Sequence, residues 1–275
     1  MIRVFSCLLL AAVLVFAVWW LMQKPSQSRV WADDVARLLH AEVNGDKVVL
    51  NNVRNFEWRT EIDYTPRWET REYDLAGLQT ADLLLSYWMG PKIAHTLVSF
   101  GFNDGQYLTF SLEIRKEQGE QFSAWKGFFR QYEAILVAAD EADIVRTRSN
   151  VRGESVYLYR LAIPPSQLKT LFLAYVQRAR ALEDKPEFYN TLTSNCTTIV
   201  YDIARQIAPD LPFDYRLLAS GYFAEYAHSQ GGLVPGYSYD MLQAKGNIVA
   251  RAKAMQPGEN FSEVIRRGVP GTTPI

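Results

Sequence analysis

The segment from residue 94 to residue 115 alternates its side chains in a way that favours one strand pairing. Two runs rich in β-branched and aromatic residues, 94–102 and 106–115, flank Asn103-Asp104-Gly105, which is typical of a three-residue hairpin loop with a left-handed glycine. Residues whose numbers sum to 208 then face each other, and one face is coherently apolar: Phe100–Leu108, Val98–Phe110, Thr96–Leu112 and Ala94–Ile114. A two-residue loop would shift the register by one and mix polar with apolar side chains on both faces, which is unfavourable when one face is buried.

The opposite face of this hairpin brings two titratable side chains together. In the same register Ser99 faces Thr109, Leu97 faces Ser111, and His95 faces Glu113, within side-chain reach. A carboxylate in that position can orient an imidazole and stabilise its charged form, which is the third role in a catalytic triad. The pair is also commonly no more than a surface ion pair, so the catalytic interpretation requires a nucleophile elsewhere in the chain.

An apolar run from Val4 to Met22 indicates that the rest of the chain is exported. About 20 apolar residues span a bilayer, so the run is just long enough. A cleaved signal peptide has a shorter apolar region with a small-residue cleavage site directly after it, and here only Ser26-Gln27-Ser28 weakly resembles such a site. We therefore predict an uncleaved anchor with a cytoplasmic N-terminus, and a cleaved signal is the alternative.

Cys196 is the candidate nucleophile, because the only other cysteine, Cys7, lies within the apolar run. Ser194 and Asn195 are good helix N-cap residues, and the stretch 199–207 repeats apolar residues at helical spacing, so the sulfur falls in a first helical turn. There the helix dipole and free N–H groups favour the thiolate. The alternative is a thiol that is simply buried.

Histidine is the side chain best suited to serve a thiolate as base near neutral pH. The chain has three: His40 at the end of an amphipathic stretch, His228 in a loop-like region, and His95 on the hairpin. The first two are expected to be surface or packing residues. Cys196, His95 and Glu113 therefore form the predicted catalytic set.

The order of predicted elements indicates an α+β fold with a mostly antiparallel sheet. Residues 1–29 form the anchor and linker, 30–254 the exported domain, and 255–275 a polar, Pro- and Gly-rich tail that we expect to be disordered. Strands are expected at 47–59, 68–73, 94–102, 106–115, 133–139 and 156–161, and helices at 31–43, 78–89 and 164–182. The net charge of −1, without basic blocks, argues against nucleic-acid binding. The lack of a Walker loop, a dinucleotide fingerprint or zinc-ligand spacing predicts that no cofactor is needed.

Several motifs in order resemble the Lnb N-terminal periplasmic domain family of bacterial envelope proteins. They lie between about Trp31 and Pro209 and comprise Asn52-Val53-Arg54-Asn55-Phe56, Asp63-Tyr64-Thr65-Pro66-Arg67-Trp68, His95 with Ser99-Phe100-Gly101-Phe102, Lys126-Gly127-Phe128-Phe129-Arg130-Gln131-Tyr132-Glu133, and the stretch 187–198 that contains Asn195-Cys196. The resemblance implies a permuted papain-like fold of the NlpC type, similar to lecithin:retinol acyltransferase, with Cys196 as nucleophile and His95 as base. Glu113 rests on the strand register alone.

The function that the resemblance implies is a lipoprotein N-acyltransferase with a thiol active site in the periplasm, anchored in the inner membrane by one span. Its expected partners are a phospholipid acyl donor and a lipoprotein acceptor. Two alternatives remain open: a cysteine amidase or peptidase acting on peptidoglycan, and a non-catalytic envelope binding module with an inert thiol.

Overall fold

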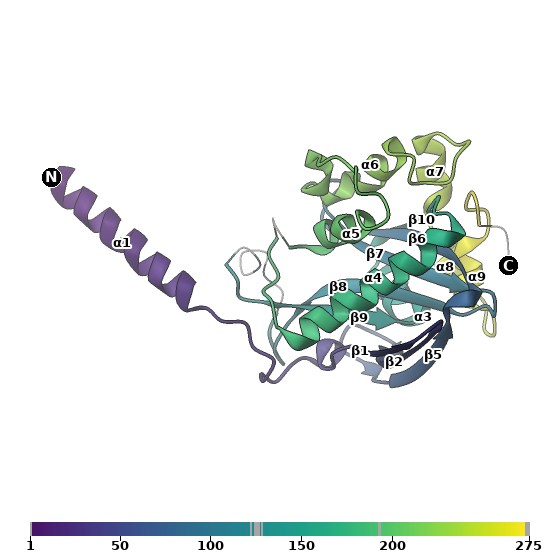
Figure 1. Cartoon of the computed structure of the whole chain (residues 1–275), viewed down its shortest axis with the longest axis horizontal. Helices are drawn as coiled ribbons and strands as arrows, with labels where there is room; N and C mark the ends of the chain where they lie inside the picture. The colour runs from purple at the N-terminus through teal and green to yellow at the C-terminus, as the bar shows by residue number, and fades with distance from the viewer. Residues whose placement is uncertain (1, 122, 124–126, 128, 192–193, 273–275) are drawn as a thin grey trace.

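A mostly antiparallel sheet is the centre of the protein (Figure 1). The structure, a computed structural model, describes residues 2–121, 123, 127, 129–191 and 194–272. Within these residues eight strands form the sheet in the order β1-β2-β9-β8-β7-β6-β10, with β5 also paired to β2, and only the contact between β2 and β9 is parallel. The strands are β1 (His40–Asn44), β2 (Lys47–Arg54), β5 (Trp68–Asp74), β6 (Leu78–Tyr87), β7 (Ala94–Phe102), β8 (Tyr107–Arg115), β9 (Glu133–Ala139) and β10 (Ser155–Arg160), while β3 (Glu57–Trp58) and β4 (Tyr64–Thr65) pair separately.

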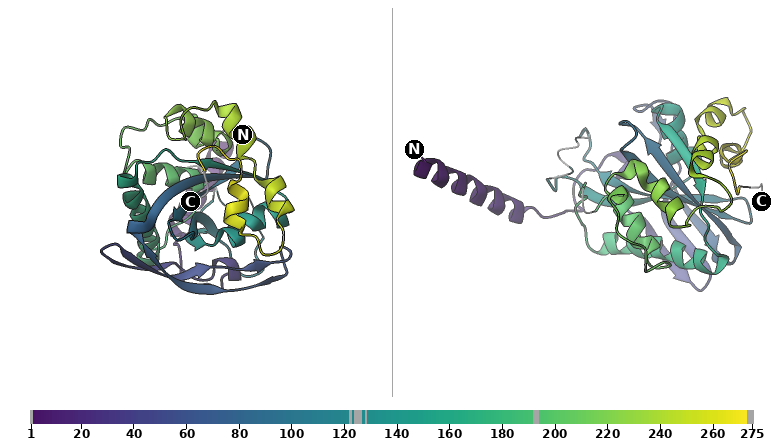
Figure 2. Two further views of the ribbon diagram at one scale, coloured as in Figure 1. Left: turned by 90° about the vertical axis from the view of Figure 1, so that its right-hand side faces the viewer. Right: turned by 90° about the horizontal axis from the view of Figure 1, so that it is seen from above.

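Helices pack on both faces of this sheet (Figure 2). The long helix α4 (Pro165–Asp184) and helix α5 (Cys196–Ala204) share one core with Phe100 and Phe110, whose rings contact Phe172 of α4. Leu97 points to the other face and shares a second core with residues of α3 (Glu141–Arg146), α8 (Val249–Ala254) and α9 (Phe261–Arg266). Helices α6 (Phe223–Ser229) and α7 (Tyr239–Gly246) complete the fold. Mixed α+β architecture is thus confirmed.

Short helical turns connect the larger elements. They are η1 (Asp33–Val35), η2 (Leu75–Gly77), the π-helical η3 (Thr147–Val151), η4 (Tyr215–Leu217) and η5 (Ser220–Tyr222).

The predicted register of the hairpin between β7 and β8 is confirmed. The paired residues of the two strands run from Gly101–Tyr107 to Leu97–Ser111, and the numbers of each pair sum to 208. Gly105 has a φ of +83°, which is the left-handed conformation that the three-residue loop requires. The ladder between these two strands ends at Leu97 and Ser111. Residues 94–96 of β7 are therefore not paired with β8.

Two predicted helices are wrong. Residues 78–87 form strand β6, whose run Leu83-Leu84-Leu85 is apolar without interruption because both of its faces are buried, and such a run cannot be told from a buried helix by periodicity. Residues 31–43 contain the turn η1 and most of strand β1 rather than one helix. The apolar residues Val35 and Leu39 are buried as expected, but a turn and an extended segment place them there.

The expectation of a disordered tail from residue 255 is wrong over its described part, which ends at residue 272. Helix α9 buries Phe261 and Ile265 against the second core. Arg266 reaches the buried carboxylates of Asp82 and Glu141, with nitrogen–oxygen distances of 2.9 and 2.7 Å. The polar composition of this segment led to the wrong prediction of disorder. The guanidinium of Arg266 completes a buried ionic network, so few apolar residues are needed to hold the segment in place.

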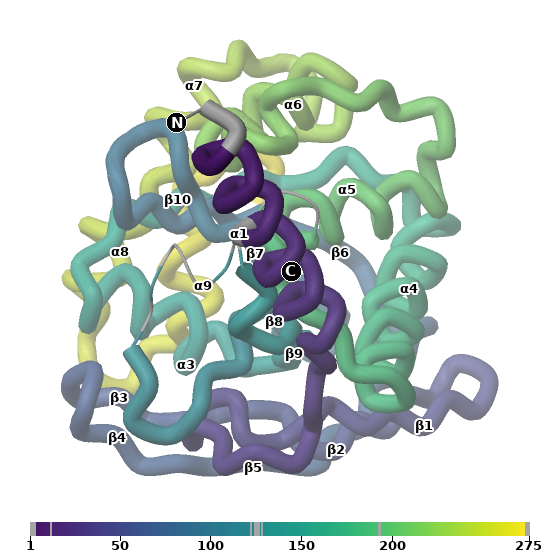
Figure 3. Tube along the Cα trace, turned by 90° about the vertical axis from the view of Figure 1, so that its left-hand side faces the viewer, coloured from purple at the N-terminus to yellow at the C-terminus, as the bar shows by residue number. Residues whose placement is uncertain are grey.

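The apolar N-terminus forms helix α1 (Ile2–Met22), and its stretch Val4–Met22 has a mean hydropathy of 2.6 and the length to cross a membrane. The linker after it contacts the domain directly. The backbone N–H of Ser26 donates to Glu133 at 3.0 Å, and the Gln27 side chain donates to two carbonyls at the end of α4 at 2.8 and 2.9 Å. Figure 3 looks at the end of the molecule from which α1 emerges.

Candidate active site

Cys196 is the first residue of α5, as predicted, and the helix start is fixed by a complete capping box. The Asn195 side chain accepts from the N–H groups of Thr197 and Thr198, both at 2.9 Å, and the Thr198 hydroxyl accepts from the Asn195 N–H at 2.9 Å. Such a reciprocal cap fixes the direction of the first turn. The sulfur is therefore held at the positive end of a nine-residue helix, where an anion is stabilised.

His95 lies next to Glu113, as the register predicts, with 3.1 Å between Nε2 and the carboxylate Oε1. The hydroxyl of Ser111 also bridges the two groups. Nε2 is 2.6 Å from Ser111 Oγ, and that hydroxyl donates to Glu113 Oε1 at 2.6 Å. Since the serine proton goes to the carboxylate, Nε2–H donates to Ser111. The ring is thus oriented from one side by a serine–glutamate pair, and its other nitrogen, Nδ1, is left for the sulfur.

The imidazole of His95 and the thiol of Cys196 lie within hydrogen-bonding reach of each other. The backbone N–H of Thr96 is also within reach of the sulfur, and Thr96 is one residue beyond the point where the β7–β8 ladder ends. The end of that ladder leaves room for the start of α5 between the strands, and the hydroxyls of Thr96 and Thr197 join the two elements at 2.9 Å. The structure therefore brings the three predicted residues into one cluster.

Electrostatics in this cluster favour a thiolate–imidazolium pair. Burial and the charge of Arg148 act to lower the pKa of His95, but Glu113 and Cys196 outweigh them and raise it to about 9. Burial also opposes ionisation of Cys196, yet the charge and hydrogen bond of His95 lower the pKa of the thiol below its ordinary value. Both shifts favour the thiolate–imidazolium pair over the neutral pair, and that charged pair is the reactive form of a cysteine nucleophile.

A buried arginine also binds the carboxylate of Glu113. Arg148, in η3, donates to Glu113 at 2.8 Å and also lies 3.6 Å from Glu154. Burial acts to raise the pKa of Glu113, but His95 and Arg148 hold it well below its usual range. Glu113 therefore stays ionised, so it can orient and charge the imidazole without taking its proton.

Tyr189 is a further neighbour of the sulfur. Its hydroxyl is within hydrogen-bonding reach of both the sulfur and the backbone N–H of Cys196. Burial, with the nearby charges of Cys196 and Glu113, raises the pKa of Tyr189 well above its ordinary value. The phenol consequently keeps its proton and remains a hydrogen-bond donor beside the nucleophile.

Sequence reasoning missed two members of the cluster, Ser111 and Arg148. Ser111 had a detectable signal, because it precedes Glu113 by two residues on the same strand and so shares its face. Arg148 had none, since it reaches Glu113 from a π-helical turn 35 residues later in the chain. His40 contacts Glu183 at the surface and His228 the carbonyl of Tyr237, so neither joins the site. Among the described residues no group of three His, Cys, Asp or Glu side chains is arranged to hold a metal ion.

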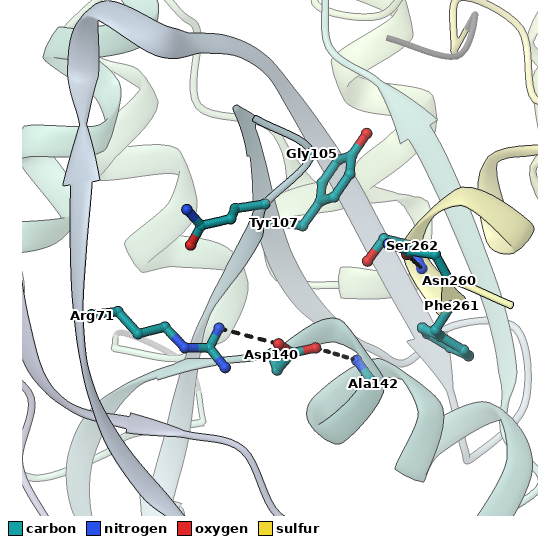
Figure 4. A pocket seen from close by; sticks show the side chains of 9 residues that line it. Arg71, Gly105, Tyr107, Asp140, Ala142, Asn260, Phe261 and Ser262 are labelled. Carbon is teal, nitrogen blue, oxygen red and sulfur yellow. Dashed lines mark hydrogen bonds and ion pairs between the residues drawn. The ribbon is translucent and has the colours of Figure 1, made fainter. Parts of the chain in front are cut away.

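A cavity of about 270 Å³ lies at the opposite end of β7 and β8, next to their hairpin loop. Figure 4 shows Tyr107 above it and the guanidinium of Arg71 directed at Asp140, 3.1 Å away. Neither Cys196 nor His95 lines this cavity, and its charged groups are paired with each other, so we assign it no part in the chemistry.

Comparison with known proteins agrees with the resemblance seen in the motifs. The profile of the Lnb N-terminal periplasmic domain matches residues 64–221, which is more than half of the chain and includes all three predicted site residues. No curated protein and no solved structure matches the chain. A periplasmic domain agrees with an N-terminal helix suited to membrane anchoring. The chain belongs to the Lnb N-terminal periplasmic domain family.

Proposed function

We propose that this protein is a membrane-anchored cysteine acyltransferase that moves an acyl chain from a phospholipid to the N-terminal amine of a lipoprotein. The observation that carries the proposal is the proximity of Cys196, at a helix start, to His95, whose Nε2 is held by Ser111 and Glu113. Membership in a periplasmic family whose name and motifs indicate lipoprotein processing supports this substrate class. We further propose that the sheet and α5 form a permuted papain-like arrangement.

In the first half-reaction the Cys196 thiolate attacks the carbonyl carbon of a phospholipid ester. The C–S bond forms while the carbonyl oxygen takes negative charge, and the Cys196 N–H with the Tyr189 hydroxyl would hold that oxygen. When the ester C–O bond breaks, the imidazolium of His95 gives its proton to the departing oxygen. The products are an acyl-cysteine and a lysophospholipid, and His95 is left neutral.

In the second half-reaction the amine of the lipoprotein attacks the thioester carbon. The neutral imidazole of His95 takes a proton from the amine, the C–S bond breaks, and an amide and the thiolate–imidazolium pair result. Glu113 stays ionised throughout, which preserves the charged form of His95 between turnovers. A covalent intermediate divides the transfer so that the two lipid-borne substrates need not be bound at once.

The test is intact mass spectrometry of the purified full chain after incubation with phospholipid vesicles. We expect one acyl adduct on the wild type, transfer of that adduct to a lipopeptide bearing a free N-terminal amine, and no adduct on Cys196→Ala. Cys7→Ser is the matched control, because it removes the other cysteine, within α1, and should acylate like the wild type.

Three results would contradict the proposal. An adduct that persists on Cys196→Ala would remove the nucleophile from its role. Release of muropeptides from purified sacculi, without acyl transfer to lipopeptide, would instead identify a peptidoglycan amidase or peptidase. An unreactive thiol, with an alkylation pKa at or above the free-thiol value of about 8.5, would indicate a binding module.

A further inference from the structure

Exposed apolar side chains of the domain gather in two short segments. Beyond α1, eleven large apolar residues are exposed among the described residues, and six of them fall within residues 88–93 and 213–218. We call these six the apolar end patch: Trp88, Met89, Ile93, Phe213, Tyr215 and Leu218. Clustering of this kind on a soluble domain marks an interaction surface, whereas single exposed apolar residues do not.

The two segments of the patch form one surface beside the active site. The N–H of Gly221 donates to the carbonyl of Lys92 at 3.0 Å, and the N–H of Ala94 donates to the Ser220 hydroxyl at 2.9 Å. These bonds tie the β6–β7 connection to the region around η4 and η5. Ile93 is only two residues before His95, so the patch borders the catalytic imidazole.

Strand directions place this patch at the same end of the sheet as the membrane anchor. Tyr87 at the end of β6 pairs with Ala94 at the start of β7, and Arg115 at the end of β8 pairs with Glu133 at the start of β9. The β6–β7 connection therefore leaves the sheet at the end where β9 begins. Figure 3 shows this end, with that connection and α1 both on the side facing the viewer.

The linker holds this end close to the membrane. Ser26 donates to Glu133, and Ser26 comes only four positions after Met22, the last residue of α1. Four extended residues reach about 14 Å at most. Additional contacts, from Arg130 to the Trp20 ring at 4.6 Å and from Phe129 to Phe16 at 6.2 Å, join the domain to α1 itself. The domain is thus tethered by this end, without a long flexible spacer.

We propose that the apolar end patch inserts into the outer face of the same bilayer that α1 spans, and that acyl chains reach Cys196 across it. The occupant is a lipid surface, because the anchor leaves the domain at this end and keeps it within reach. The exposed Lys92, between the apolar side chains of the first segment, supplies a cation at the level of phospholipid headgroups. The delivery of acyl chains rests on the proposed function, while insertion of the patch does not.

Two methionines of equal exposure make a matched test. Met89 in the patch is 50% exposed and Met241 in α7 is 49% exposed. A nitroxide is attached at residue 89 or 241 through a cysteine substitution (Met89→Cys or Met241→Cys) in the full chain carrying Cys7→Ser and Cys196→Ala, reconstituted in vesicles of phosphatidylethanolamine and phosphatidylglycerol. We expect the label at position 89 to be relaxed by oxygen more than by a water-soluble nickel chelate, and the label at 241 to show the reverse. Equal access of the nickel chelate to both positions would overturn insertion.

Kinetics of chains that retain Cys196 test delivery of the substrate. Met89→Asp should lower the rate of acyl-enzyme formation from vesicle phospholipid about tenfold, because a charge replaces a side chain that lipid would bury, and Leu218→Asp should behave alike. Met241→Asp should match the wild type.

All three variants should keep the wild-type rate of acyl-enzyme formation with a monomeric short-chain phospholipid. Insertion at position 89 without any rate loss in Met89→Asp would overturn the delivery role, and absence of acyl-enzyme in every chain would refute the proposed function while the nitroxide result still stands.

Discussion

Replacing Glu113 by glutamine should lower the pKa of His95 while leaving the ring in place. The carboxylate lies 3.1 Å from Nε2, where Coulomb attraction amounts to about 5 kcal/mol at an effective dielectric constant of about 20. Opposite charges at such distances shift a pKa by about 1 to 3 units in proteins. Glutamine keeps an oxygen that can accept from Ser111 but carries no charge, and Arg148 continues to oppose the protonated ring. We therefore expect the pKa of His95 to fall by about 2 units.

The consequence for catalysis follows from the sign of this shift. A pKa of about 9 leaves about 97% of His95 protonated at pH 7.5, and a pKa lower by about 2 units leaves about a quarter. The imidazolium must protonate the departing oxygen, so acyl-enzyme formation should slow about fourfold at pH 7.5. The alkaline limb of the pH–rate profile should move down by about 2 units. The acid limb of the profile, which follows ionisation of Cys196, should not move to higher pH. The charge of Glu113 raises the pKa of Cys196, and the substitution removes that charge.

The direct assay is an NMR titration of the full chain in detergent micelles with ¹³C-labelled histidine, since the sequence has only three histidines. Variants His40→Gln and His228→Gln assign the other two signals. Glu154→Gln is the matched control, because Glu154 also contacts Arg148, whereas the carboxylate beside Nε2 of His95 is that of Glu113, so the His95 signal should titrate as in the wild type. A His95 that titrates near 6.5 in the wild type, or at the same pH with and without Glu113, would refute the electrostatic reasoning.

Three further substitutions test the surroundings of the site. Asn195→Ala should lower the free energy of unfolding by about 1 kcal/mol through loss of the N-cap, measured by urea denaturation, and Asn195→Asp should recover that stability; equal losses in both variants would contradict the capping role. Tyr189→Phe should slow acyl-enzyme formation about 100-fold in single-turnover mass spectrometry without changing the urea midpoint, and an unchanged rate would exclude the hydroxyl as an oxyanion donor. Arg266→Ala should cost about 3 to 5 kcal/mol of stability, because two carboxylates lose a buried partner, and a shift under 1 kcal/mol in the same denaturation assay would disprove the importance of that network.

Local patterns predicted the elements that this site depends on. The hairpin of β7 and β8 was predictable because alternation, a turn tripeptide and a buried face all require one register. The start of α5 was predictable because Asn195 is a strong N-cap followed by a helical repeat. These two inferences together bring His95 next to Glu113 and put Cys196 in a first turn. The proximity of Cys196 to His95 could be predicted only from the tertiary fold and the family resemblance, and the structure places the two side chains close together.

The parts that sequence reasoning missed depend on contacts between distant segments. Strand β6 was misjudged because burial on both faces removes the alternation that distinguishes a strand. Arg148 reaches Glu113 only through the packing of η3 against the sheet. Arg266 is paired with a carboxylate 184 residues earlier in the chain. No local pattern encodes such partnerships, since each residue taken alone resembles a solvated surface arginine.

The ionic network of Arg266 also sets when the sheet can become stable during export. Asp82 and Ser99 lie on adjacent central strands, and Glu141 begins the helix beneath them. As the polypeptide emerges from a translocation channel, Asp82 and Glu141 enter the periplasm well before residue 266 does. Until the guanidinium arrives, Glu141 would have to be buried without its cationic partner and Asp82 with Arg160 alone, which disfavours the closed core. The nascent chain is therefore kept loose for most of its passage, and a product interrupted before residue 266 would remain open to envelope proteases.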